Sequence, residues 1–181
     1  GCFPDEATDV WNSFSVPWPH SEIDVENLIP DWPETEEDES GIFFTSNDVA
    51  FEPTDPERLI QWILNTVEAE GHELNRLDIV FCSDEFLLEI NRNHLDHDYY
   101  TDIITFPLND NPLIAEIYIS IDRVQENATG LNIPFEDELH RVMIHGVLHL
   151  CGYDDHEEED IRVIRKKEEF YLKKLAAVGE L

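Results

Sequence analysis

The feature that most constrains this chain is a pair of histidines inside an apolar helical segment near its C-terminal end. His145 and His149 stand four residues apart in the run HRVMIHGVLHLCGYDDH at 140–156. At 3.6 residues per turn their side chains share one face of a helix. Gly152 is placed to end that helix in a left-handed conformation. Two imidazoles at this spacing can hold one metal ion.

Further donors follow the predicted helix end, namely Asp154, Asp155 and His156. Two histidines and one later donor leave a fourth position for water, as in catalytic zinc sites. An isolated histidine pair at this spacing is more often a surface or hydrogen-bonded core pair. Here the apolar helix, the glycine and the following donors together favour a metal site. Gly146 follows the first histidine, where H-E-x-x-H peptidases carry their general-base glutamate, so the pattern disfavours that mechanism.

Three stretches resemble the YbeY family. The run His145-Gly-Val-Leu-His149-Leu-Cys-Gly-Tyr-Asp is similar to the family signature H-G-x-L-H-L-x-G-Y-D-H. Leu88–Pro107 is similar to the family stretch L-N-x-x-Y-R-x-x-D-x-P-T-D-V-L-S-F-P, and Ile114–Ser120 resembles its G-D-I-x-I-S strand. The resemblance covers residues from about 41 to 176.

The resemblance implies a zinc-dependent endoribonuclease that cuts single-stranded RNA in ribosomal RNA maturation and ribosome quality control. It implies one zinc ion per chain, with His145 and His149 as ligands at the catalytic centre. The implied partners are ribosomal RNA and ribosomal particles, with a ribosomal protein or a GTPase as a candidate protein partner. The alternatives are a metal-dependent peptidase or other hydrolase, and a non-catalytic ribosome-maturation adaptor whose metal is structural.

The chain departs from the family pattern at three places. The family spacing between the second and third histidine lands on Asp155, whereas the histidine comes one residue later, at His156. Both residue types are accepted zinc ligands, so both stay candidates for the third ligand. Leu95 stands at the position of the family's arginine, and Ala115-Glu116 replaces its Gly-Asp pair.

The charge is extreme, at −31 from 42 acidic and 11 basic residues. Such a chain is a poor partner for a bare phosphate backbone, because Lys and Arg contacts dominate nucleic-acid affinity. RNA must then be met locally, with Arg92, Arg123 and Arg141 as candidate contacts, or be presented by the ribosome. Residues 1–40 hold 12 acidic and no basic residues, which predicts a largely disordered N-terminal arm before a domain at 41–181.

Helical and strand patterns alternate along the domain. They predict an α/β (α+β) fold with one small mixed sheet flanked by four to five helices. Expected strands cover 41–53 (a strand or hairpin), 77–82, 102–107 and 113–121, and expected helices cover 56–71, 83–93, 122–129, 134–151 and 157–177. The loop His94–Thr101 carries further donors, for which a substrate-contact or surface role is expected. Three cysteines at unrelated spacings and no apolar run of membrane-spanning length predict a cytoplasmic protein with reduced thiols.

Overall fold

The computed structural model describes residues 14–15, 40–94 and 100–178. In chain order its elements are β1 (Phe14–Ser15), β2 (Gly41–Ser46), α3 (Pro56–Ala69), β3 (Leu74–Cys82), α4 (Asp84–His94), β4 (Ile103–Asn109), β5 (Leu113–Ser120), α5 (Ile121–Leu131), α6 (Phe135–Leu150) and α7 (Glu158–Val178). Among the residues so described, no helix is both long and apolar enough to cross a membrane.

The strands form one mixed sheet in the order β1-β4-β5-β3-β2. Strands β2, β3 and β5 run parallel to one another, and β4 runs antiparallel to β5 through a short turn. β1 adds two residues parallel to β4, with Phe14 opposite Ile104. The predicted class, a small mixed sheet with helices, is therefore confirmed. The segment at 41–53 forms one strand that pairs with β3, and the chain bends after Ser46.

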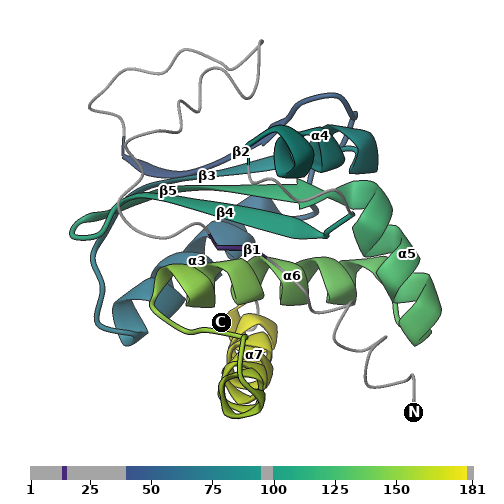
Figure 1. Cartoon of the computed structure of the whole chain (residues 1–181). Helices are drawn as coiled ribbons and strands as arrows, with labels where there is room; N and C mark the ends of the chain where they lie inside the picture. The colour runs from purple at the N-terminus through teal and green to yellow at the C-terminus, as the bar shows by residue number, and fades with distance from the viewer. Residues whose placement is uncertain (1–13, 16–39, 95–99, 179–181) are drawn as a thin grey trace.

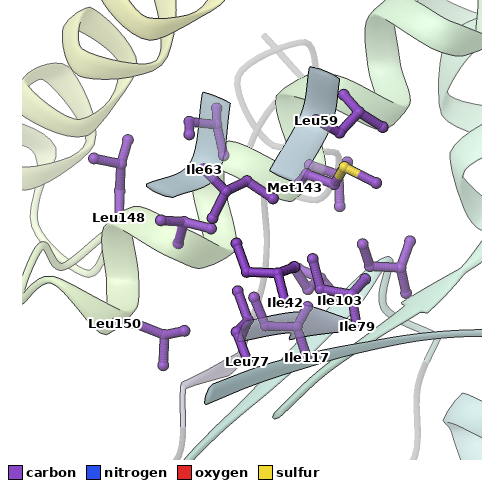
Figure 2. Packing of buried hydrophobic residues seen from close by; sticks show 14 of the residues in the cluster. Ile42, Leu59, Ile63, Leu77, Ile79, Ile103, Ile117, Met143, Leu148 and Leu150 are labelled. Atoms are coloured by element: carbon purple, nitrogen blue, oxygen red, sulfur yellow. The ribbon is translucent and has the colours of Figure 1, made fainter. Parts of the chain in front are cut away.

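Helices cover both faces of the sheet (Figure 1). Helix α4 covers one face, where a small cluster contains Leu87, Ile90, Phe106 and Tyr118. Helices α3 and α6 lie on the other face, α7 packs against both of these helices, and the three enclose the larger core. Figure 2 shows Ile63 and Met143 from the helices beside Ile79 and Ile117 from the strands.

Helix α6 is the central helix of this core. Every residue from Val142 to Leu150 is buried, because the sheet lies on one side of the helix and α7 on another. Gly146 sets how closely the helix approaches the sheet. A Cβ atom at this position would lie 2.6 Å from Cδ1 of Ile103 and 3.3 Å from Cδ1 of Ile117. Any larger residue at this position would have to displace the end of the Ile103 side chain.

The strand or hairpin expected at 41–53 ends at Ser46, seven residues before its predicted end, whereas the other predicted boundaries agree with the structure to within three residues. Ser83 begins α4 as expected, since its hydroxyl accepts a hydrogen bond from the Phe86 amide at 3.1 Å. The helix expected at 122–129 instead begins at Ile121 and ends at Leu131, with Ser120 as its N-cap. The N-terminal arm stays a prediction, because apart from β1 and residue 40 it lies outside the described residues.

We predict that Gly146→Ala destabilises the protein, whereas Gly130→Ala on α5 does not. Alanine favours a helix over glycine by up to about 1 kcal/mol. At residue 146 this gain is opposed by overpacking, which typically costs about 1–3 kcal/mol. At Gly130 no atom lies within 4 Å of an added Cβ. Urea unfolding of the two variants checks this difference, and a Gly146→Ala protein as stable as Gly130→Ala would contradict the tight contact.

Candidate metal centre

The two histidines meet on one face of α6, as the four-residue spacing predicts. Their Nε2 atoms are 3.0 Å apart and the rings are nearly perpendicular, at 84°. His145 is 3% exposed and His149 is 7% exposed. The helix thus brings two imidazoles to one point at the border of the core.

The turn after α6 returns a third donor to this point. Gly152 has the predicted left-handed backbone, with φ of +107°. Its amide donates to the His149 carbonyl at 3.0 Å, and the Tyr153 amide donates to the Leu148 carbonyl at 3.1 Å. This bond pattern is the Schellman motif, which reverses the chain direction. Oδ2 of Asp155 then lies 3.3 Å from Nε2 of His145 and 3.4 Å from Nε2 of His149.

Contacts on the far side of each ring set which nitrogen carries the proton. Nδ1 of His145 lies 2.6 Å from Oε2 of Glu168, a buried carboxylate on α7. Nδ1 of His149 lies 2.8 Å from the carbonyl oxygen of Tyr153. A carbonyl can only accept, so the His149 Nδ1 must donate, and a carboxylate favours the same state for His145. In the neutral rings both Nε2 atoms therefore present lone pairs.

Three electron-pair donors thus converge at 3.0–3.4 Å from one another. Such an arrangement is unfavourable unless a cation, either a proton or a metal ion, lies between the donors. Bonds of about 2.0–2.2 Å in a tetrahedral zinc site place ligand atoms roughly 3.3 Å apart. His145, His149 and Asp155 form the one three-residue group of this kind within the described part of the chain. These residues fit a metal ion of zinc's size and preference.

The carboxylates govern the charge at the site. Burial acts to lower the pKa of His145, but hydrogen bonds with Asp155 and Glu168 outweigh it and raise this pKa to about 9. Burial acts to raise the pKa of Asp155, yet its contacts with both histidines hold it below its ordinary value. The site attracts positive charge, which again suits a metal cation.

Glu70, at the end of α3, forms hydrogen bonds with both elements that support the histidines. Its carboxylate accepts hydrogen bonds from the Tyr153 hydroxyl at 2.8 Å, from Nζ of Lys167 at 3.2 Å and from the Tyr171 hydroxyl. Tyr153 belongs to the Schellman turn that leads to Asp155. Lys167 and Tyr171 lie on α7 next to Glu168. One residue therefore positions both the turn and the helix behind the site.

Two further carboxylates are buried beside His145. Burial raises the pKa of Asp102 well above its ordinary value, and it raises that of Glu138 to about 7. Nδ2 of Asn127 lies 3.4 Å from Oδ2 of Asp102. The charge of His145 acts in the opposite direction and lowers the pKa of both groups, so both lie within electrostatic reach of that ring.

The remaining predicted site residues lie outside the cluster of three metal donors. His156 is exposed and lies outside the cluster that contains Asp155. Arg92 borders a hollow with Asp48, Glu85 and Glu89. Arg123 forms an ion pair with Asp84 at 2.7 Å. Arg141 borders a hollow between α6 and α7.

Of the other two departures from the family pattern, one lies outside the described residues and the other lies within β5. Leu95 and the other residues of the 95–99 loop, with the donors predicted there, lie outside the described residues. Ala115-Glu116 falls within β5, where Glu116 pairs with Asp78 across the strands. Burial and the nearby Asp78 raise the pKa of Glu116 to about 8.

Sequence reasoning missed Glu168, although a signal for it was present. The buried face of α7 contains Ile164, Glu168, Tyr171 and Leu175, at spacings of three and four residues. A charged residue within such an apolar stripe requires a partner inside the core. The pattern could have marked Glu168 as buried and paired, but it does not reveal that His145 is the partner.

The fold and the site together define a class of protein: a single α/β domain whose central helix holds a His–His pair completed by an aspartate. Comparison with known sequences gives the family. The family profile of endoribonuclease YbeY matches residues 42–176. The chain belongs to the YbeY family.

Individual relatives agree with this assignment. The endoribonuclease YbeY of Flavobacterium psychrophilum is 42% identical over 127 residues, which cover 70% of this chain and 91% of that protein. That of Cytophaga hutchinsonii is 41% identical over 136 residues, covering 74% and 95%. The solution structure of TM1509 from Thermotoga maritima superimposes with a TM-score of 0.56 at 28% identity, covering 77% of this chain and 91% of that one.

We predict that Glu168→Gln weakens metal binding about 10–100-fold, the usual effect of removing the partner of a metal-bound histidine. Glutamine keeps the size of the side chain but loses the charge that holds the His145 Nδ1 proton. Glu116→Gln is the matched control, because Glu116 is also a buried carboxylate but lies in β5 opposite Asp78. Metal titration by calorimetry measures both variants. Equal affinities in the two proteins would show that the Glu168 contact does not orient the ring.

Proposed function

We propose that this protein is a zinc-dependent endoribonuclease that cuts single-stranded RNA during ribosomal RNA maturation. The observation that carries the proposal is the convergence of His145, His149 and Asp155 within 4.8 Å of one another in a member of the YbeY family. The relatives from Flavobacterium psychrophilum and Cytophaga hutchinsonii are both named endoribonuclease YbeY. RNA is therefore the substrate class that the family supports.

Zinc is the metal that best suits these donors. Two imidazoles and one carboxylate are a common set for catalytic zinc, and three protein ligands leave a fourth position open. When bound, the ion would supply Lewis-acid chemistry, acidifying a water molecule and polarising a phosphoryl oxygen. The protein's own contribution is to orient the ligands. Glu168 and the Tyr153 carbonyl hold both Nδ1 protons, and this directs the Nε2 lone pairs to the ion.

Asp155 is the third ligand in this proposal. Its carboxylate already lies 3.3–3.4 Å from both Nε2 atoms, whereas His156 is exposed outside the cluster. The Schellman turn supports this choice, because the Tyr153 carbonyl that orients His149 comes only two residues before Asp155. A carboxylate adds negative charge to the ligand set, so a bound water would be less acidic than in a site of three histidines.

The charge of the chain favours RNA that is presented by a larger particle. With a net charge of −31, the protein as a whole repels a free phosphate backbone. Ribosomal particles, in which protein and RNA are already folded together, can present a single strand at one point. We propose ribosomal RNA in such particles as the substrate.

The contact at Gly146 disfavours the peptidase alternative. The general base of an H-E-x-x-H peptidase is absent at this position, and the Cβ of a glutamate there would lie 2.6 Å from Cδ1 of Ile103, which would have to move. The remaining alternative, an adaptor with a structural metal, differs from the proposal only in activity.

Elemental analysis coupled to an RNA cleavage assay tests the proposal. The purified protein should carry about one zinc ion per chain and cut single-stranded RNA but not the same sequence in a duplex. His149→Ala should lose the metal and the cleavage, while His156→Ala, outside the cluster, should keep both. Stoichiometric zinc without cleavage after chelation and reconstitution would contradict the enzyme and support the adaptor.

A further inference from the structure

Tyr100 holds an exposed aromatic ring in a fixed position just before β4. The residue is 43% exposed. Even so, its hydroxyl donates to Oε1 of Glu85 at 2.7 Å, and the guanidinium of Arg123 lies 5.0 Å from its ring centroid. Two contacts therefore hold the exposed ring in one orientation.

Arg123 is itself held in place beneath the ring. Its Nη2 donates to Oδ2 of Asp84 at 2.7 Å and its Nε to Oδ1 of the same carboxylate at 3.4 Å. The Ser120 hydroxyl donates to that carboxylate as well, at 2.9 Å. The guanidinium is therefore engaged with Asp84 and with the ring. It supports one face of Tyr100 by a cation–π contact.

Tyr100 is connected to the metal centre through the start of β4. Ile103, three residues later, packs against Gly146, the neighbour of His145. Three residues of extended chain span at most about 10 Å. A strand of a few nucleotides that is bound at the metal centre can therefore reach the ring.

The charge of the protein favours stacking over phosphate contacts as a way to hold RNA. Proteins that hold single strands combine basic grooves with aromatic rings on which bases stack. This chain has 11 basic residues against 42 acidic ones, and Arg92 and Arg123 both lie beside carboxylates. Stacking needs no positive charge. We propose that Tyr100 stacks on a base of the RNA strand that is cleaved at the His145–His149–Asp155 centre, an inference that rests on the function proposed above.

Binding of a short single-stranded 2′-O-methyl RNA, which resists hydrolysis, tests this contact in the full chain. Tyr100→Ala should weaken binding roughly five- to a hundredfold, the range for loss of one stacked base. Tyr100→Phe keeps the ring and should bind nearly as the wild type does. Zinc content should stay the same in both variants. Because stacking releases no counterions, the ratio between wild type and Tyr100→Ala should stay constant as salt rises.

Phe170→Ala is the matched control, because Phe170 is 50% exposed and Nζ of Lys174 lies 5.1 Å from its ring. It lines a hollow between α3 and α7, so its loss should leave RNA binding unchanged. A series of RNAs that each lack one base completes the test. Removing the stacked base should weaken binding to the wild type but cause no further loss with Tyr100→Ala.

The stacking contact is overturned if Tyr100→Ala binds as tightly as the wild type, if Phe170→Ala weakens binding equally, or if no missing base couples to Tyr100. Failure of the proposed function gives a different result. In that case the wild type would cut no RNA, while the Tyr100-dependent loss of binding would persist. If the wild type cleaves RNA but binding does not depend on Tyr100, the proposed endoribonuclease activity stands and the stacking contact is rejected.

Discussion

The rest of the structure depends on the hydrogen bonds that satisfy two buried imidazoles in an apolar helix. Helix α6 is buried between the sheet and α7, so each polar ring atom needs a partner within the protein. Glu168 and the Tyr153 carbonyl take the two Nδ1 atoms, and the Nε2 atoms are left to face Asp155. The same bonds fix α7 and the Schellman turn against α6. The geometry of the site is therefore a consequence of how the core packs.

Local rules explain the part of the site that could be predicted from the sequence. Helical spacing unites His145 and His149, and the left-handed preference of Gly152 ends the helix so that later donors return. Local rules could not choose between Asp155 and His156, because one residue in a turn decides which side chain points inward. Glu70 is 83 residues from Tyr153 along the chain, and a contact over that separation leaves no local pattern.

The fold shows the same division between local and distant effects. Alternating periodicities predicted the class and most elements, because each element buries one apolar face. The strand order β1-β4-β5-β3-β2 and the parallel pairing of β2 with β3 depend on distant segments. Gly146 shows both a local and a distant effect. Its identity was visible in the sequence as a departure from the peptidase pattern, but its physical reason, the contact with Ile103, required the packed sheet.

The most direct test of the account is an anomalous diffraction measurement at the zinc absorption edge on crystals of the protein grown with zinc. We expect one strong peak per chain between Nε2 of His145, Nε2 of His149 and Oδ2 of Asp155. The Nδ1 atoms should keep their contacts with Glu168 and the Tyr153 carbonyl. A peak elsewhere in the chain, or one ligated by His156 with Asp155 turned away, would contradict the account.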